Sequence, residues 1–479
     1  MKMVLQDSKT GYTPTRTWPQ YVAAGIATIS ALILGTHLSW PSTAVQMLLS
    51  PSSEIPITEY DGSWIGSIIT LGACAGAIPT GIIANLLGPK RTLQIMAVPL
   101  LVPWYIIAFS QNLWMIYLAR LLAGIGVGST CVAAPMYVTE LAEARVRGML
   151  GTFFQLQMTV GFLIGYFLGL VIKSFTILAL VSSSFPIIFL ILFYFMPESP
   201  YYLISKNKLS EARKVLQFLR GYDYNIENEL TTIKEKIDEI ATNKCKFSDL
   251  YRYRATLKAM IIALALMLFQ QLSGVNAILF YAGPIFEKSS GSLSSGCCAV
   301  IIGAVQVLST LGAAMLIERL GRKILLLVSG SLMATCLIIL GTYFHLDMLN
   351  YDMTSFSFVP LVCVAIYVVA FSVGFGPIPW MIAGDIFSIK VKGVAASIST
   401  TFNWTLAFAV TKLFIPIKEE IGIGLTFGIF GVVCVFAFIF TLVCIPETKG
   451  KSLEEVQILL SGQSLKSSAS DTDSNNDNV

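Results

Sequence analysis

The stretch IIALALMLFQQLSGVN, residues 261–276, places seven residues rich in polar side chains directly after nine apolar ones. Gln270, Gln271 and Asn276 supply three amides, and Ser273 supplies a hydroxyl. Side-chain amides are costly inside a bilayer unless they find hydrogen-bonding partners, so this stretch indicates a polar-lined interior. Each amide donates and accepts, which suits a neutral polyhydroxylated ligand, whereas a charged solute would require a charged partner. The alternative is that these amides bond neighbouring helices and hold a bundle together.

The spacing of the amides also predicts a break in the helix that carries them. Gln271 and Asn276 are five residues apart, which is about 140° of azimuth on a straight helix. They can therefore face one ligand only if the helix bends between them. The Ser273–Gly274 pair is a place where such a bend is expected.

The composition of the whole chain is that of a helical membrane protein. Mean hydropathy is +0.73, with 55% hydrophobic and 13% charged residues, which is far from the averages of soluble domains. We predict an all-α polytopic membrane protein with twelve transmembrane helices in two pseudo-symmetric six-helix halves. The spans are expected at 20–40, 63–86, 92–110, 113–137, 149–172, 176–196, 257–281, 293–317, 324–345, 357–383, 392–415 and 422–445.

The basic residues indicate on which side of the membrane each segment lies. With both termini in the cytoplasm, 27 of the 32 Lys and Arg side chains fall inside, as the positive-inside rule expects. Only Lys173, Lys288, Lys412 and Lys418 then fall outside, and Arg120 lies within a span. The polar N-terminus lacks the short apolar core of a signal peptide, so the first apolar run is expected to remain as a span.

The apolar and polar segments divide the chain into five parts. We expect a cytoplasmic tail over 1–19, a first half over 20–196 and a cytoplasmic linker with short amphipathic helices over 197–256. A second half over 257–445 and a cytoplasmic tail over 446–479 follow.

Three sequence elements recur in the same order in both halves, which indicates a duplication. A glycine followed by a basic cluster comes after spans two and eight, and a carboxylate seven residues before a basic residue comes after spans four and ten. The triplets Pro-Glu-Ser at 197–199 and Pro-Glu-Thr at 446–448 end spans six and twelve. A protein built this way can rock its halves about a site near the middle of the membrane.

Several other classes of protein are disfavoured by the residues present. The nine cysteines sit singly apart from Cys297-Cys298, so neither a disulfide framework nor a zinc site is expected. With only His37 and His345, a histidine metal cluster is not expected either. We find no nucleophile–base constellation and no P-loop, so an enzyme is not expected, and neither is a cofactor or a nucleic-acid partner.

In its motifs the chain resembles the sugar-porter family of the major facilitator superfamily over nearly its whole length. The motifs are QQLSGVN at 270–276, GPIPW at 376–380, PESP at 197–200, PETKGKSLEE at 446–455, ELAEARVRG at 140–148 and ERLGRK at 318–323. Finer details of the sequence look most like the insect facilitated-trehalose-transporter branch, which is close to the animal glucose facilitators. The resemblance implies the major facilitator fold and a small-molecule sugar as the partner, in a protein that functions as a monomer in the plasma membrane.

The resemblance also implies a set of sugar-binding side chains on several spans. Most are amides, which bridge sugar hydroxyls, and one is a Trp, whose face packs on the apolar face of a pyranose. They are Gln155, Gln270, Gln271, Asn276, Gln306, Trp380 and Asn403. Gln306 stands where the family usually has Asn, and both Gln306 and Asn403 could instead bond a neighbouring helix.

A second set of residues at the cytoplasmic ends of spans is expected to gate the protein. Salt bridges between the halves would hold the outward-facing state and break when the protein opens inward. The residues are Glu140, Arg147, Glu318, Arg322, Lys323, Asp385 and Lys392. Asn85 and Pro89 depart from the family pattern in the first half, which weakens the expected network, and solvated positive-inside charge is the alternative.

His37 and Arg120 bear on the driving force. Proton-coupled relatives place an Asp on span one opposite this Arg, whereas here the nearest matching position is His37. Without that carboxylate we favour facilitated diffusion of a hexose or trehalose. The alternatives are a proton-coupled sugar or polyol symporter, in which His37 could titrate, and a non-transporting sugar receptor.

Overall fold

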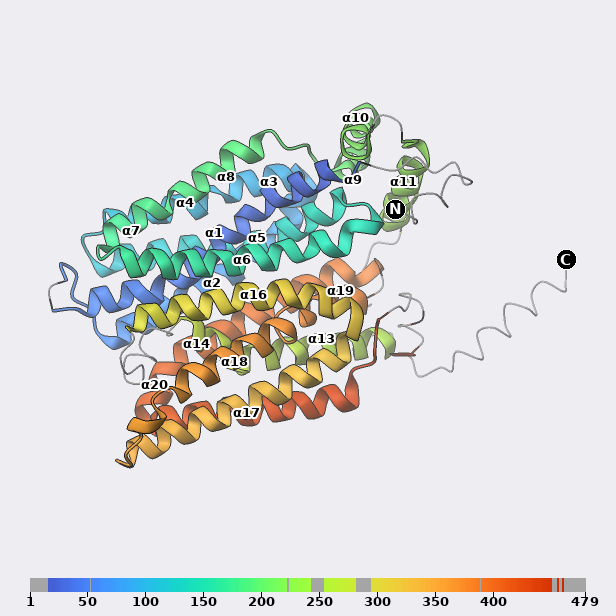
Figure 1. Cartoon of the computed structure of the whole chain (residues 1–479). Helices are drawn as coiled ribbons and strands as arrows, with labels where there is room; N and C mark the ends of the chain where they lie inside the picture. The colour runs from blue at the N-terminus through green and yellow to red at the C-terminus, as the bar shows by residue number, and fades with distance from the viewer. Residues whose placement is uncertain are drawn as a thin grey trace, which may run out of the picture.

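The computed structural model describes residues 16–51, 53–221, 224–242, 254–280, 294–387 and 389–449, together with 455 and 459–460. All regular structure in these ranges is helical. The long helices run side by side in one bundle, and the short helices α9 (Pro200–Ser205), α10 (Leu209–Arg220) and α11 (Glu227–Thr242) gather at one end of it (Figure 1). The all-helical membrane architecture predicted from composition is confirmed.

The first half contains six apolar spans, two of which are each made of two consecutive helices. Their helices are α1 (Trp18–Leu49), α2 (Glu59–Leu87), α3 (Pro89–Met96), α4 (Val98–Ala108), α5 (Leu113–Leu141), α6 (Ala144–Val171), α7 (Phe175–Ser182) and α8 (Ser184–Tyr194). Helix α1 extends nine residues beyond the predicted end of span one at residue 40, because Pro41 is accommodated inside the helix.

The second half also provides six spans, although its last two are joined. Its helices are α13 (Arg254–Leu272), α14 (Val275–Phe280), α16 (Ser295–Leu320), α17 (Arg322–Met348), α18 (Val359–Val373), α19 (Ile378–Asp385) and α20 (Ile389–Cys444), with a 3-10 turn, η2, at Thr354–Phe356. The apolar part of α20, Val394–Cys444, has 51 residues, or about 76 Å, more than twice the hydrocarbon core. Gly422 has φ +83° inside this helix, so α20 is two spans that meet at a turn.

The packing of the helices repeats between the halves. In the first half α1 packs on α6 and α2 on α5, and in the second half α13 packs on α20 and α16 on α18. The halves meet through α2 against α20 and through α6 against α16, two contacts that the internal symmetry exchanges. Helices α1 and α6 approach each other closely at Gly161. A Cβ at this position of α6 would lie only 2.1 Å from the Leu32 carbonyl oxygen of α1.

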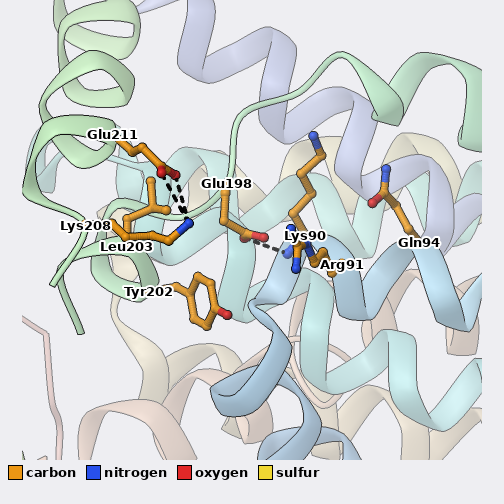
Figure 2. Close-up of a pocket in the computed structure, with 8 residues that line it drawn as sticks. All are labelled: Lys90, Arg91, Gln94, Glu198, Tyr202, Leu203, Lys208 and Glu211. Atoms are coloured by element: carbon orange, nitrogen blue, oxygen red, sulfur yellow. Dashed lines mark hydrogen bonds and ion pairs between the residues drawn. The ribbon is translucent and has the colours of Figure 1, made fainter. Parts of the chain in front are cut away.

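The predicted duplication is visible at the cytoplasmic turns. Gly88 and Gly321 have φ of +91° and +89°, and each precedes a helix whose first backbone N–H groups donate to a glutamate from the end of the same half. Glu198 accepts from Lys90 N at 3.0 Å (Figure 2). In the second half Glu447 accepts from Lys323 N at 3.1 Å. These glutamates come from the Pro-Glu-Ser and Pro-Glu-Thr triplets, so the matched sequence elements form matched structural ones.

The two glutamates differ in their titration. Burial raises the pKa of Glu198, against the opposing effect of the N–H donors of Ser199 and Lys90. Burial also acts to raise the pKa of Glu447, but backbone N–H groups of Lys449, Arg322 and Lys323 together hold it below its ordinary value. The pKa values of the two equivalent glutamates are therefore shifted in opposite directions, upward in the first half and downward in the second.

The linker helices are fastened to the first half through Arg220, at the end of α10. Its guanidinium pairs with Glu229 of α11 at 2.7 and 3.1 Å and donates to the Leu141 carbonyl at the end of α5 at 2.9 Å. Gln20 of α1 adds a bond from its amide to the Leu219 carbonyl. Arg220 is only 2% exposed, and these partners compensate its buried charge.

We expect Arg220→Ala to loosen the linker helices strongly, because it leaves Glu229 without its cation and removes the anchor to α5. Breaking a buried ion pair costs about 3–5 kcal/mol. The measurement is limited proteolysis of the linker, and cleavage should be at least tenfold faster in the variant. Arg213→Ala is the control, since Arg213 pairs with Glu227 across an exposed surface and should matter little. Equal cleavage of the two variants would contradict the anchoring role.

Candidate functional site

The helix that opens the second half breaks where the sequence predicted. Helix α13 ends at Leu272, Gly274 has φ +82°, and α14 begins at Val275. A Cβ on Gly274 would lie 2.4 Å from the ring of Phe430, so both the backbone conformation and the space favour glycine. The predicted bend between Gln271 and Asn276 is confirmed.

The bend brings four amides into one continuous hydrogen-bonded chain. Asn276 donates to Gln271 Oε1 at 2.6 Å, and Gln271 donates to Asn403 Oδ1 of α20 at 2.9 Å. Asn403 donates to Gln270 Oε1 at 2.8 Å, and Gln270 donates to the carbonyls of Phe375 and Gly376 at 2.7 and 2.9 Å. Three of the four amides are at most 5% exposed. We refer to Gln270, Gln271, Asn276 and Asn403 as the amide network.

The last acceptors in this chain come from a second broken helix. Helix α18 ends at Val373 and α19 begins at Ile378, so the carbonyls of Phe375 and Gly376 lie in the gap between them. Backbone groups at such a gap lack partners within a helix, and the Gln270 amide supplies one. The amide network therefore joins two broken helices to α20.

The network does not use all of its hydrogen-bonding capacity. Both N–H groups of Gln270 are used, and those of Asn403 go to Gln270 and to the Met267 sulfur at 3.3 Å. Gln271 and Asn276 each use only one of their two side-chain N–H groups in bonds between described residues. The side-chain carbonyl oxygen of Asn276 also accepts no hydrogen bond within the described ranges. Helix-to-helix bonding is thus present, and donors and an acceptor are left for a ligand.

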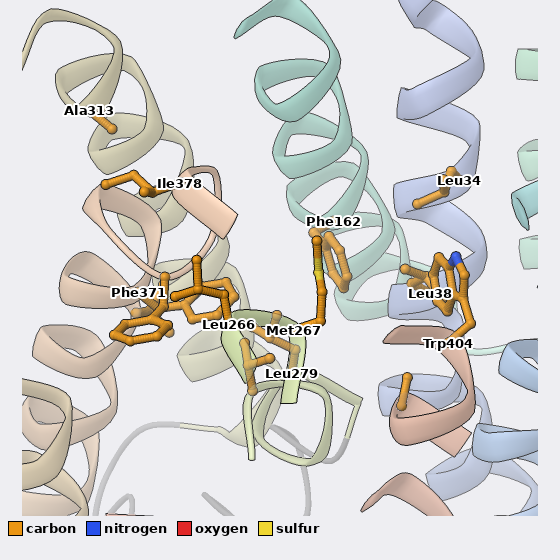
Figure 3. Close-up of a cluster of buried hydrophobic side chains, with 14 of the residues drawn as sticks. Leu34, Leu38, Phe162, Leu266, Met267, Leu279, Ala313, Phe371, Ile378 and Trp404 are labelled. Carbon is orange, nitrogen blue, oxygen red and sulfur yellow. The ribbon is translucent and has the colours of Figure 1, made fainter. Parts of the chain in front are cut away.

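Apolar side chains from both halves form one buried cluster, and α13 and α20, which carry three of the four network amides, contribute to it. Leu34 and Leu38 of α1 and Phe162 of α6 come from the first half, and Met267 and Trp404 come from the second (Figure 3). Hydrogen bonds in such a low-dielectric setting are stronger than in water, and an unmet polar group there is more costly. The site is therefore a small polar patch in an apolar interface between the halves.

The other predicted sugar ligands lie on separate helices. Gln306 of α16 is 2% exposed, and within the described residues its Oε1 has no hydrogen-bond partner. Gln155 is half-buried on α6, and Trp380 on α19 is 37% exposed. No hydrogen bond between described residues joins these three side chains to the amide network.

The sequence did not predict the roles of two polar side chains on α18. Tyr367 of α18 places its hydroxyl 3.1 Å from both the hydroxyl and the carbonyl oxygen of Ser273, which braces the bend. The Ser372 hydroxyl of α18 is buried without a partner in the described part of the chain. A tyrosine in an apolar span carries no distinguishing signal, and neither does a serine.

The predicted gating residues make contacts within their own halves. Glu140 accepts from the Ser199 hydroxyl, and Arg147 donates to the Ala142 carbonyl at 3.3 Å, all in the first half or at its edge. Lys323 Nζ donates to the Leu442 carbonyl at 2.9 Å, within the second half, where Arg322 N also donates to Glu447. The side chains of Glu318, Asp385 and Lys392 lie outside the described residues. The salt-bridge network between the halves stays a prediction.

The Arg120 side chain is completely buried and points at backbone carbonyls. It donates to the carbonyl oxygens of His37 at 2.7 Å and Ile65 at 2.9 Å, and its guanidinium lies 5.4 Å from the Trp40 ring. The His37 ring bonds the Leu100 carbonyl at 2.9 Å and stacks on Trp104. The Arg120 guanidinium therefore hydrogen-bonds the backbone carbonyl of His37. The imidazole ring of His37 instead bonds the backbone of another helix, α4.

Twelve membrane spans within the described residues, in two related halves with a polar network at a helix break in the second half, define the major facilitator fold of membrane transporters. Solved structures share this fold. The xylose transporter XylE from E. coli, in a partially occluded inward-open conformation, superposes with a TM-score of 0.76 at 24% identity, covering 91% of this chain and 100% of that one. The proton:xylose symporter XylE bound to 6-bromo-6-deoxy-D-glucose also gives 0.76 at 24% identity, over 92% and 99%.

Sequence comparison defines the family. The protein-family model described as "Sugar (and other) transporter" matches residues 17–460, and the chain belongs to this family. A facilitated trehalose transporter, Tret1, from Bombyx mori is 39% identical over 94% of this chain and 88% of the relative. Tret1 from Apis mellifera ligustica is 39% identical over 95% and 91%. The resemblance drawn from the motifs is confirmed.

Proposed function

We propose that this protein carries a neutral sugar, trehalose or a hexose, across the plasma membrane by facilitated diffusion. The observation that carries the proposal is the amide network, because it puts unused neutral donors and an acceptor beside the bend between α13 and α14. Neutral amides match sugar hydroxyls without requiring a charge on the ligand. The names of the insect relatives support the same class of substrate.

Within the network the four amides have different proposed roles. Gln271 and Asn276 bind sugar hydroxyls with their remaining N–H groups and carbonyl oxygen. Gln270 spends both N–H groups on backbone carbonyls, so it positions Asn403 and the broken helix and binds sugar only through its oxygen. Among the four amides, we therefore expect the loss of the Gln271 side chain to weaken sugar affinity the most.

Three further side chains complete the proposed site from other helices. Gln306 offers a buried carbonyl oxygen that lacks a partner among the described residues, which suits a sugar hydroxyl as donor. Trp380 offers a partly exposed indole, whose apolar face packs on the C–H face of a pyranose. Gln155 adds an amide from the first half, so that sugar would be held by both halves at once.

The proposed mechanism is alternation of the halves 20–196 and 257–445 about this site. The charged residues at the cytoplasmic ends of the spans would form the inner gate, with the linker over 197–256 attached to the first half. A two-state equilibrium of this kind is moved by a few kcal/mol. Several salt bridges of about 0–1 kcal/mol each would therefore be enough to bias it.

The absence of a carboxylate in the sequence of span one supports uniport over proton symport. Residues Trp18–Leu49 include no Asp or Glu, and the Arg120 guanidinium is bonded to backbone carbonyls, which do not exchange protons. Sugar movement is then driven by the sugar gradient alone.

The test is uptake of radiolabelled trehalose and hexoses into vesicles that contain the purified protein, with and without an inward proton gradient. Uptake should saturate with sugar concentration and should change less than about twofold when the gradient is imposed. Stimulation by about tenfold or more would instead indicate a symporter. Sugar binding without flux would indicate a receptor.

A further inference from the structure

A lysine of the second half is inserted between aromatic rings of the first half, on the side of the membrane away from the linker. Lys412 lies on α20, nine residues beyond Asn403, which is about 13 Å along the helix. Its neighbours Tyr60, Ser63 and Trp64 lie in the first two turns of α2, near the outer end of that helix. The contact therefore joins the two halves above the amide network.

The geometry of this contact is specific. Lys412 Nζ lies 2.8 Å from the Ser63 hydroxyl, 3.9 Å from the centre of the Tyr60 ring and 4.3 Å from the Trp64 ring. An ammonium over two aromatic faces is held by both ring quadrupoles, and the interaction strengthens where water is excluded. The Asp61 carboxylate also interacts with it electrostatically. We refer to Tyr60, Ser63, Trp64 and Lys412 as the lysine cage.

Below the lysine cage the same two helices stay in contact. The rings of Trp64 and Phe408 lie 6.3 Å apart, and the Cys74 sulfur of α2 lies 3.8 Å from the Thr401 carbonyl and 3.6 Å from the Thr405 hydroxyl of α20. The contact between α2 and α20 thus continues from the cage to the level of Asn403. Opening the outer side would have to withdraw Lys412 first.

We propose that the lysine cage is the outer gate of this transporter: Lys412 closes α20 against α2 and releases them when the protein opens to the outside. This inference rests on the proposed function, since a gate needs a transport cycle. It assigns Lys412 a positioning role, because the residue acts on Asn403 and the sugar through the movement of α20.

A second lysine on α20 provides a matched comparison. Lys418 Nζ lies 3.4 Å from a carboxylate oxygen of Glu59, which is 60% exposed. An exposed ion pair contributes little, whereas a caged ammonium loses ring contacts and a hydroxyl acceptor when it is withdrawn. Removing Lys412 should therefore open the outer side, and removing Lys418 should not.

The test reads the state of the gate at Cys74 and does not require transport. An impermeant maleimide is added outside cells that express the full-length protein, and the labelling rate of Cys74 is measured by mass spectrometry of its peptide. Lys412→Met keeps the apolar stem and removes the charge, and it should raise the labelling rate on the order of tenfold. Lys412→Arg should restore it, because a guanidinium also binds ring faces, and Lys418→Gln should change it less than twofold.

The outcomes separate the gate from the proposed function. Unchanged labelling in Lys412→Met would overturn the gate even if the native protein takes up sugar. Raised labelling in Lys412→Met, together with no sugar flux through the native protein, would keep the cage as the contact that closes the outer side and would reject sugar as the substrate. If Lys412→Met does not reach the cell surface, Tyr60→Leu tests the same cage, since Tyr60 is 58% exposed and dispensable for the core. Tyr60→Leu should raise labelling severalfold, and an unchanged rate would overturn the proposal.

Discussion

Replacing Gln271 by alanine is expected to raise the KM for the transported sugar by about 10- to 100-fold. The change removes the bond to Asn403 at 2.9 Å and the acceptor of Asn276 at 2.6 Å, in addition to the proposed bonds to the sugar. A neutral hydrogen bond contributes about 1 kcal/mol, and a buried group left without a partner costs about 1–3 kcal/mol. Losses of about 1.4–2.8 kcal/mol correspond to the stated range.

The measurement is the concentration dependence of initial uptake into vesicles, with the amount of folded protein fixed by gel filtration and thermal unfolding. Gln94→Ala is the matched control, because Gln94 lines the cytoplasmic pocket beside Lys90 and Glu198, away from the amide network (Figure 2). A KM within twofold of the native value would remove Gln271 from the sugar site and leave it as a bond between helices.

Replacing Gly274 by alanine is expected to disrupt the site more broadly. An L-residue at φ +82° costs about 1–2 kcal/mol. Its Cβ would also lie 2.4 Å from the Phe430 ring, so Phe430 or the bend must shift. Since Gln271 and Asn276 lie on either side of the bend, we expect transport to fall at least tenfold and the thermal stability of the protein to drop.

A double-mutant cycle separates the two causes. Phe430→Ala makes room for the new Cβ but leaves the backbone strain, so Gly274→Ala in that background should cost less than it does alone. Gly312→Ala on α16 is the control, because a Cβ there meets no atom within 4 Å and the backbone is helical. Equal, near-native activity of Gly274→Ala and Gly312→Ala would contradict the role of the bend.

Much of the fold followed from the sequence because the constraints are local or repeated. Apolar runs long enough to cross a bilayer predict helices, and the sequence of the amides with Ser273-Gly274 predicted the break between α13 and α14. The repeated triplets pointed to the paired cytoplasmic turns, where Glu198 and Glu447 accept from the helix starts. Each of these depends on residues within one motif or on its copy.

Other parts of the site depend on which side chains face each other on helices that are far apart in the sequence. A single sequence carries no readable pattern for such contacts. The carbonyl acceptors of Gln270 lie more than a hundred residues away in the gap before α19. Lys412 was expected only as a residue on the outer side, and the aromatic rings that hold it belong to the other half. Backbone acceptors and ring faces leave no charge or spacing pattern to recognise.

The most direct test of the central claim is equilibrium binding of the transported sugar to purified native protein and to Gln271→Ala. The sugar chosen is the one that saturates uptake in the vesicle panel. We predict saturable binding to the native protein and affinity at least tenfold weaker in the variant, with both proteins folded in the absence of sugar, as cooperative thermal unfolding would show. Equal affinity in the two proteins would contradict the assignment of the amide network as the sugar site.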